Sequence, residues 1–528
     1  MRYKCFLFSF YRFSLRFARL NILFLICFLP AGFSSILLAN GEVRQSGAAD
    51  EAQQLVKQAN KLARKGEYAE AEKILRRAVE ISPLDTKIKL SLAYVLIKQR
   101  QLTEAYEFSI AVAKAEPKNS YAFALLGTTF LSAGNFSSAT IAFVNALKLN
   151  KRESLAWAGL GALDFYENRM ADGLANLRTA VYFDPEAPDF IFTLAQVAAR
   201  AEQYKEAAAA YEKFLEVSPP TDSERRDRIK GLIKFLRFLG DRQSLYAVAN
   251  QGQTIVSFRL VNDRPILEVK INKTDEPLKF VLDTGSGISV VSDETAQRLK
   301  IKAVSRGGTA RAIGGNGKFE IVYGFLQSVN IGDVKIKNVP VYIRKFHSTD
   351  ERIDGYIGLS LISKFLTTLD YGNLTFSLRR KDLTDDKKPV NELLSLPLRL
   401  TSSGFLSGEV RLEGIETPLN FIVDTGASVS VISDALAGTK EISRFVKDEK
   451  MRVTGAAGVM ENVPSFLLPR VTFGTHSRES LKAISLDLNL INEASGFEQA
   501  GILGGNFLKN YRLTFDFENS KVIFVPVK

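Results

Sequence analysis

Two stretches of the sequence decide the fold: FVLDTGSGISVVSD at residues 280–293 and FIVDTGASVSVISD at residues 421–434. They agree at 8 of 14 positions without a gap, and most of the differences exchange Val, Ile and Leu. Each stretch places the tripeptide Asp-Thr-Gly after an apolar run typical of a buried strand, and the glycine allows a tight turn directly after the carboxylate. We interpret the second stretch as an internal copy of the first, which pairs Asp283 with Asp424.

A matched pair of carboxylates can do chemistry that a single one cannot. Two carboxyl groups a few ångströms apart cannot both ionise easily, so they share a proton. One can then take a proton from a water molecule while the other donates to a carbonyl oxygen, which needs neither a metal nor a covalent intermediate. Such a pair needs two equivalent loops that face each other across a two-fold axis. A gene duplication can supply both loops within one chain. We expect Thr284 and Thr425 to hydrogen-bond across that axis and hold the loops rigid.

A later element also occurs twice: Gly355-Tyr356-Ile357-Gly358 follows the first tripeptide, and Gly501-Ile502-Leu503-Gly504 follows the second. With this order of motifs, residues 254–528 resemble the tandem aspartic proteases of the retropepsin-like and pepsin-like group. The resemblance implies an all-β bilobal fold with two pseudo-symmetric lobes, at 254–380 and 391–528, and a polypeptide substrate. It also implies that the later element braces the catalytic loop, and that glycine-rich flaps close over the substrate.

The resemblance assigns a role to each matching residue. The expected catalytic residues are Asp283 and Asp424. The residues expected to support the catalytic loops are Thr284, Gly285, Ser286, Thr425, Gly426 and Ala427. The residues expected in the bracing loops are Ile357, Gly358, Leu503 and Gly504. The flap candidates are Ile313, Gly314, Gly315, Gly455, Ala456 and Gly458, and the lack of a tyrosine in either flap stretch favours a retropepsin-like pair.

The two catalytic loops differ at one position. Ser286 follows the first tripeptide, and Ala427 follows the second. A neighbouring hydroxyl that donates to a carboxylate favours its charged form. We therefore expect Asp283 to be the ionised partner and Asp424 the protonated one.

Each of the two lobes is also long enough to form its own sandwich-like core.

The N-terminal half carries a second, shorter repeat. Small residues recur every 34 residues from Ala71 to Ala207, and prolines recur at the same spacing from Pro83 to Pro219, with Lys151 in one slot. This period predicts an all-α solenoid of five tetratricopeptide-like (TPR) helix pairs over residues 50–220. We expect a capping helix and linker at 221–250. The array would bind a protein partner through its groove, or would only space the following region from an anchor. These two interpretations have similar weight.

The chain begins with a basic segment followed by an apolar run, which predicts a signal peptide or membrane anchor at residues 1–39. The remainder would then be exported: periplasmic or otherwise extracytoplasmic, secreted, or N-terminally tethered to a membrane. Both cysteines, Cys5 and Cys27, lie in this leader, so we expect no disulfide in the rest. The formal charge of +12 falls to +7 without the five basic leader residues, and no nucleic-acid motif accompanies it, so no nucleic-acid partner is expected.

Other hydrolytic chemistries lack their motifs. The chain has two histidines and neither His-Glu-x-x-His nor Gly-x-Ser-x-Gly, so we expect no metal and no cofactor. The sequence thus predicts an aspartic endopeptidase with a TPR array that recruits a partner or substrate. Two alternatives stay open: a catalytically inactive peptide-binding scaffold, and a protease that is active only as an intermolecular dimer.

Overall fold

The computed structural model describes most of the chain. The described residues are 34–242, 244–250, 252–312, 314–315, 317–347, 351–383 and 394–527. The chain divides into two units between Glu51 and Ala52. Residues 1–33 of the predicted leader lie outside the described part, as do Ile313 and most of the segment expected to link the lobes. Within the described residues, no helix combines the length and apolar character that a bilayer crossing needs.

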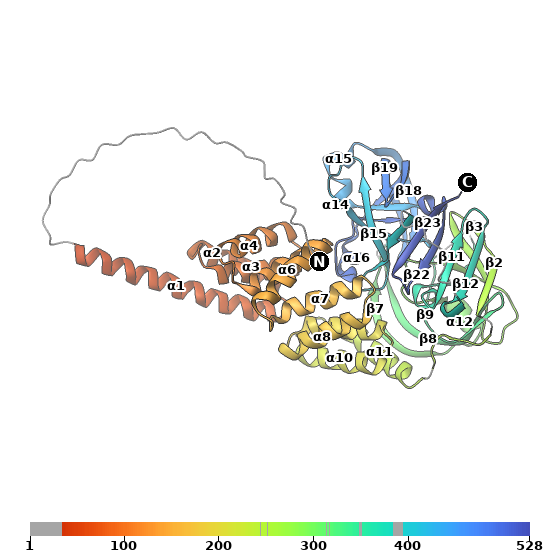
Figure 1. The fold of residues 1–528 in the computed structure, drawn as a ribbon, viewed down its shortest axis with the longest axis horizontal. Helices are drawn as coiled ribbons and strands as arrows, with labels where there is room; N and C mark the ends of the chain where they lie inside the picture. Colours follow the sequence, from red (N-terminus) through yellow and green to blue (C-terminus); the bar gives the residue numbers. More distant parts are fainter. Residues whose placement is uncertain are drawn as a thin grey trace, which may run out of the picture. The chain divides into compact units, whose positions relative to one another are not determined.

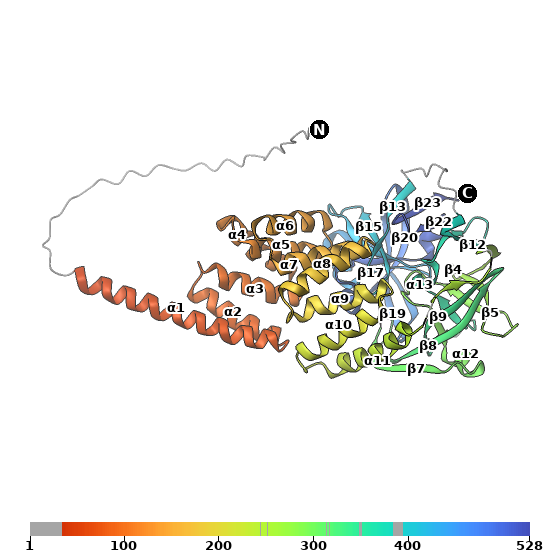
Figure 2. The same ribbon diagram turned by 60° about the horizontal axis from the view of Figure 1, so that its bottom comes forward.

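The first half of the described chain is helical. The helices are α1 (Ser34–Arg64), α2 (Tyr68–Ile81), α3 (Thr86–Lys98), α4 (Leu102–Ala115), α5 (Ser120–Ser132), α6 (Phe136–Leu149), α7 (Ser154–Tyr166), α8 (Met170–Phe183), α9 (Pro188–Arg200), α10 (Tyr204–Val217) and α11 (Ser223–Gly240). Helices α1 to α10 form five hairpins, as the 34-residue period predicts, and α11 follows them. Figure 2 shows α2 to α10 packed side by side in one array, and in Figure 1 the colours run along the same array from orange at α2 to yellow at α10.

The period corresponds to two structural positions in each hairpin. The small residues at the helix crossing are buried, and a Cβ atom on Gly173 would lie 3.0 Å from the Gly161 carbonyl oxygen. Helices α7 and α8 therefore approach too closely there for a larger side chain. The turn between paired helices always contains a residue of positive φ, the conformation that ends a helix and reverses the chain. These turn residues, again spaced by 34, are Gly66, Arg100, Gly134, Asn168 and Glu202.

The second half consists of strands with short helices between them. The first-lobe strands are β1 (Ala247–Val248), β2 (Gln253–Ser257), β3 (Arg259–Val261), β4 (Arg264–Ile271), β5 (Leu278–Leu282), β6 (Val290–Ser292), β7 (Ala303–Arg311), β8 (Lys318–Ile331), β9 (Val334–Arg344), β10 (Gly355–Ile357), β11 (Phe365–Asp370) and β12 (Thr375–Arg380). The second-lobe strands are β13 (Ser395–Pro397), β14 (Arg399–Leu400), β15 (Leu406–Leu412), β16 (Leu419–Val423), β17 (Ser430–Ser433), β18 (Val446–Gly455), β19 (Gly458–Phe473), β20 (His476–Leu486), β21 (Gly501–Leu503), β22 (Tyr511–Asp516) and β23 (Lys521–Pro526). The short helices are α12 (Asp293–Arg298), α13 (Leu359–Ile362), η1 (Lys381–Leu383), α14 (Asp434–Ala437), α15 (Lys440–Ser443), α16 (Asn489–Ser495) and α17 (Gly505–Leu508).

Each lobe has its own sheet, and a third sheet joins the lobes. The first-lobe sheet runs β1-β9-β6-β10-β5-β4-β8-β7 with β3 on β4, and the second runs β14-β15-β16-β21-β17-β20-β19-β18. The third sheet runs β13-β23-β22-β11-β12-β2, with three strands from each half. Its central strands, β11 and β22, pair in antiparallel orientation and so connect the two halves directly. The order of strands in the two lobe sheets is that of a duplicated unit, which confirms the predicted all-β bilobal fold.

The hydrophobic core differs from the sequence-based expectation of one core in each lobe. A single cluster of buried side chains includes Phe280 of the first lobe, Phe421 of the second, and Phe376 and Phe515 of the joining sheet. The six-stranded sheet supplies the apolar surface that fuses the two cores. The lobes are therefore held together by buried apolar area as well as by the chain connection.

The turns of the helical hairpins pack against the second lobe. The ring of Phe497 lies 5.0 Å from the rings of both Phe136 and Tyr166, and is fully buried. The backbone N–H of Glu498 donates to the Ser132 carbonyl at 2.9 Å. The array and the β region therefore share an apolar interface.

Helix α11 packs against the first-lobe hairpin of β7 and β8. A Cβ atom on Gly231 would lie 2.2 Å from the carbonyl oxygen of Arg306, so the helix and β7 are in backbone contact. The hydroxyl of Ser305 donates to the Gly231 carbonyl at 2.9 Å, and Phe235 stacks on Tyr323 with ring centroids 4.7 Å apart. Helix α11, which lies in the segment expected to hold a capping helix and linker, thus covers a first-lobe hairpin as well as the end of the array.

Candidate active site

Each Asp-Thr-Gly tripeptide begins where a buried strand ends. Strand β5 leads to Asp283 and pairs in parallel with β10, while β16 leads to Asp424 and pairs in parallel with β21. The N–H of Asp283 donates to the Ile357 carbonyl at 3.0 Å, and the N–H of Asp424 donates to the Leu503 carbonyl at 3.0 Å. The later hydrophobic-glycine element therefore fixes the backbone of each aspartate directly.

The two threonines bond across the two loops in a reciprocal pattern. The hydroxyl of Thr284 donates to the Val423 carbonyl at 2.6 Å, and that of Thr425 donates to the Leu282 carbonyl at 2.7 Å. Each hydroxyl also accepts the backbone N–H of the other threonine, at 3.1 and 3.0 Å. Both side chains are fully buried. Four short hydrogen bonds away from water hold the loops in one fixed relation.

The bracing loops also match. The N–H of Gly358 donates to the Ser289 hydroxyl at 3.1 Å, and the N–H of Gly504 donates to the Ser430 hydroxyl at 3.1 Å. The next residues along, Leu359 and Gly505, donate to the carbonyls of Ser286 and Ala427 at 2.8 and 2.7 Å. The geometry of the support is thus nearly the same in both lobes.

The two carboxyl groups are in contact within one chain. A Cβ atom on Gly285 would lie 2.5 Å from the Asp424 carboxyl carbon, and one on Gly426 would lie 2.8 Å from the Asp283 carboxyl carbon. Each loop therefore needs glycine because the opposite carboxyl occupies the space beside it. The carboxyl groups share a hydrogen bond, which one proton between them makes possible. A second copy of the chain is not needed to form the pair.

The surroundings of the two carboxyl groups favour Asp283 as the protonated partner. Burial, and then the charge of Asp424, raise the pKa of Asp283 well above its usual value. Burial also raises the pKa of Asp424, but the N–H of Gly426, which donates to it at 2.7 Å, opposes this rise. This order is opposite to the sequence-based prediction that Asp283 is the ionised partner. The premise of that prediction fails because the Ser286 hydroxyl donates to the Ile288 carbonyl at 2.7 Å.

The tips of the two predicted flaps meet. The first flap is the turn between β7 and β8, and the second is the turn between β18 and β19. A Cβ atom on Gly314 would lie 2.4 Å from the Gly455 Cα, and one on Gly315 would lie 2.5 Å from the Ala457 carbonyl oxygen. The contact is therefore between backbones, and glycine permits it.

The other flap candidates that the structure describes lie on the second hairpin. Gly455 ends β18 and pairs with Gly458, the first residue of β19, and Ala456 belongs to the turn between them. Ile313 lies outside the described residues. The structure thus brings five of the six candidates into the two hairpin turns.

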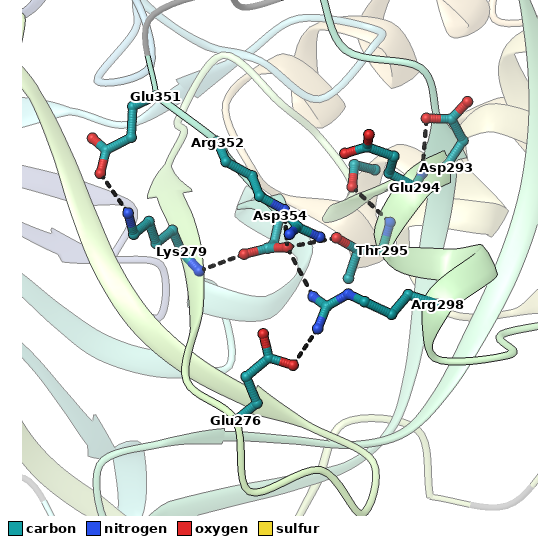
Figure 3. Close-up of polar contacts among 10 residues, drawn as sticks. Glu276, Lys279, Asp293, Glu294, Thr295, Arg298, Glu351, Arg352 and Asp354 are labelled. Carbon is teal, nitrogen blue, oxygen red and sulfur yellow. Dashed lines mark hydrogen bonds and ion pairs between the residues drawn. The ribbon is translucent and has the colours of Figure 1, made fainter.

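A buried carboxylate supports the first lobe only. Asp354 directly precedes β10, and its oxygens accept the hydroxyl of Thr295 at 2.6 Å and the N–H of Lys279 at 3.0 Å (Figure 3). The guanidinium of Arg298 lies 3.3 Å from the same carboxylate. Asp354 is not among the site residues predicted from the sequence. Its signal was an acidic residue immediately before the first bracing element, where the second copy has Ala500.

Comparisons with known proteins agree with this geometry. An aspartyl protease family model matches residues 267–361 and 408–507, and tetratricopeptide repeat models match residues 62–128 and 188–221. Comparison with curated proteins finds no match.

Solved structures include a likeness to each half. An aspartic proteinase from Irpex lacteus is 15% identical over 52% of this chain and 98% of its own, with a TM-score of 0.37. A thermophilic TPR protein of Thermus thermophilus is 21% identical over 34% of this chain and 98% of its own, with a TM-score of 0.31. The strand order, the paired loops and the family matches together show that the chain consists of tetratricopeptide repeats followed by two lobes of the aspartyl protease type.

Proposed function

We propose that the protein is an aspartic endopeptidase that hydrolyses peptide bonds with water held between Asp283 and Asp424. The observation that carries this proposal is the contact of the two carboxyl groups, at the ends of matched strands, in loops joined by the Thr284–Thr425 hydrogen bonds. A buried pair with a shared proton holds the general base and the general acid that the reaction needs.

The two carboxyl groups have different roles in this mechanism. The ionised Asp424 takes a proton from the water, whose oxygen attacks the carbonyl carbon of the peptide. Asp283 gives its proton to the carbonyl oxygen, so a neutral tetrahedral diol forms. Transfer of a proton to the leaving nitrogen and collapse of the diol break the C–N bond. The products are a carboxylic acid and an amine, and the dyad regains its single proton.

The substrate would bind as an extended strand between the dyad and the hairpin tips. Strand-like peptides offer main-chain N–H and C=O groups to neighbouring backbone. The meeting of two glycine-rich tips supports this placement, because two such hairpins can cover a peptide from above. We further propose that the TPR array binds a protein partner or the substrate protein, which is the usual use of such arrays.

Cleavage of a denatured protein by the purified full chain tests the catalytic proposal. Wild type, Asp283→Asn and Asp424→Asn are compared between about pH 3 and pH 8. We expect wild type to cut the protein internally, and both variants to lose this activity. A wild-type protein that cleaves nothing at any of these pH values would favour the peptide-binding scaffold. Specific activity that does not change on dilution is expected, and activity that falls on dilution would favour the intermolecular dimer.

Export is a separate proposal, supported by the basic and apolar start of the sequence. Residues 1–60 can be fused to a reporter enzyme that is active only outside the cytoplasm. We expect reporter activity, and we expect it to disappear when the apolar run is interrupted by charged residues. Equal activity in both fusions would contradict export by this segment.

A further inference from the structure

The two lobes differ where the strands flank the catalytic loops. Strands β4 and β15 pair in the same register with the strands that lead to the two aspartates, which puts Arg264 at the position of Phe405. Strands β9 and β20 pair in the same register with β6 and β17, which puts Arg344 at the position of Leu486. Two arginines of the first lobe therefore replace two apolar residues of the second.

The second-lobe positions belong to an apolar wall. Leu486 is buried and forms a cluster with Ile422 and Ile502, two residues of the strands around Asp424. Phe405 and Ala427 pack against the same cluster. Because Ala427 belongs to the catalytic loop, this wall continues up to the dyad. Phe405 and Ala427 are only half-buried, so an apolar side chain of a bound peptide would meet matching surface at these two residues.

The first-lobe arginines lack the partners that buried cations usually have. The Nε atoms of Arg264 and Arg344 are both buried without a hydrogen-bond partner. Neither guanidinium forms an ion pair with any residue that the structure describes, whereas Arg259 and Arg298 of the same lobe do. An unpaired cation that is partly removed from water is unfavourable. A ligand that brings a carboxylate would relieve this cost.

Aromatic rings fix the position of Arg344. Its guanidinium carbon lies 5.3 Å from the ring centroid of Phe319, on the β7–β8 hairpin, and 5.9 Å from that of Phe346. Phe346 in turn packs edge-on against Tyr356, with centroids 5.0 Å apart. Such ring contacts hold a guanidinium in place but leave its N–H donors free for a planar anion.

The arginines lie close enough to the dyad to act on a residue beside it. Both carboxyl groups raise the pKa of the Tyr356 hydroxyl, after the larger effect of burial, and Arg264 and Arg344 lower it. The charge of Arg344 also lowers the pKa of Asp283, against the burial that raises it. Strand β10, which carries Tyr356, lies between β5 and β6; β5 leads to Asp283 and pairs with the strand of Arg264, and β6 pairs with the strand of Arg344. The two arginines and Tyr356 are therefore on strands that surround the first Asp-Thr-Gly loop.

We propose that Arg264 and Arg344 form a subsite that binds an acidic side chain of the substrate, on the first-lobe side of the scissile bond. The wall around Phe405 and Leu486 takes an apolar side chain on the other side. This inference rests on the proposed endopeptidase function. The two surfaces together give the enzyme a preference for bonds between an acidic and an apolar residue. The guanidinium group matches a carboxylate in geometry and charge.

Matched peptides test the subsite. Each peptide has Leu on one side of a defined bond and Glu, Gln or Lys on the other, in both orders, and kcat/KM is measured with the full chain. We expect wild type to prefer Glu over Gln by about tenfold or more, the typical effect of one charge-assisted hydrogen bond. Arg344→Gln should reduce that ratio toward one, and Arg344→Glu should favour Lys over Glu.

The variants need controls for folding and for bulk charge. Lys270→Gln removes an exposed cation from the same strand as Arg264 and should leave the preference unchanged. If Arg344→Gln does not fold, as judged by circular dichroism, Arg264→Gln serves as the second variant with the same expected loss of preference.

The possible failures are distinguishable. Equal cleavage of Glu and Gln peptides by wild type would overturn the acidic subsite and leave the endopeptidase proposal intact. An unchanged preference in a folded Arg344→Gln variant would show that the arginine only packs against Phe319, and would also overturn the inference. A wild type that cleaves none of the peptides and no denatured protein would overturn both proposals.

Discussion

The strands beside the first catalytic loop carry Arg264 and Arg344, whereas the second lobe has Phe405 and Leu486 at the same register positions. The loops that these strands flank differ far less. Their threonine and glycine hydrogen bonds match to within about 0.1 Å between lobes. The duplicated parts have therefore stayed alike where the dyad requires symmetry, and they differ where a substrate would touch.

The supports behind the loops differ as well. Asp354 ties the first bracing strand to β5 and α12 through polar contacts, and the second lobe has Ala500 in its place. Helix α11 covers the first hairpin and makes backbone contact through Gly231. A nearly symmetric site is thus held in two chemically distinct lobes. Substitutions in each lobe can therefore separate what the lobes share from what distinguishes them.

The largest expected effect is the loss of either catalytic aspartate. Asp283→Asn and Asp424→Asn should each lower kcat/KM by about 10²- to 10⁴-fold, because general acid and general base act on one shared proton. The two losses should be similar in size, although the environments differ. Peptide cleavage under steady-state conditions measures both. Retention of most activity in one variant would show that the carboxyl groups do not act as a pair.

The next effect concerns the first lobe alone. Asp354→Ala should lower the free energy of unfolding by about 2 to 3 kcal/mol, because it removes hydrogen bonds to a buried carboxylate. Glu276→Ala is the matched control: it removes the more exposed acidic partner of Arg298 and should cost less than about 1 kcal/mol. Urea unfolding measures both. Equal costs would mean that Asp354 does not support the bracing strand.

The threonine pair tests the symmetry. Thr284→Val and Thr425→Val should each cost about 1 to 3 kcal/mol in unfolding free energy, because each leaves a buried carbonyl and a buried N–H without a partner. The double variant should cost less than the sum, since the two residues share one network. A double-mutant cycle in urea measures this coupling. Additive costs would show that the loops are fixed independently.

The smallest expected effect is the change in thermal stability with pH that the two carboxyl groups cause. The raised pKa of Asp283 stabilises the fold at low pH, and this contribution is lost as pH rises through that pKa. Each tenfold change in the acid dissociation constant between the folded and unfolded chain corresponds to about 1.4 kcal/mol. Asp283→Asn cannot ionise, so its Tm should rise relative to wild type between acidic and neutral pH. Asp424→Asn should gain less, because N–H donors stabilise the Asp424 charge. A larger gain in Asp424→Asn would reverse the proton assignment.

The sequence was sufficient for features encoded by repetition. The copied Asp-Thr-Gly stretches located the dyad, and the 34-residue spacing located the five hairpins. It was insufficient for features that depend on a rotamer or on strand register. The Ser286 hydroxyl turns to the Ile288 carbonyl, a contact that no spacing indicates. The joining sheet arises from β11 pairing with β22, and only such register information places Arg344 beside Ser292 of β6, at the position that Leu486 has in the second lobe.

The interface between the helices and the lobes has a practical consequence. Phe497 and Tyr323 lie against aromatic rings of the helical half, so a fragment that begins near residue 250 would expose both rings to water. Apolar surface uncovered in this way promotes self-association. The β-rich half therefore cannot be expressed alone without exposing these rings, because the preceding helices cover them.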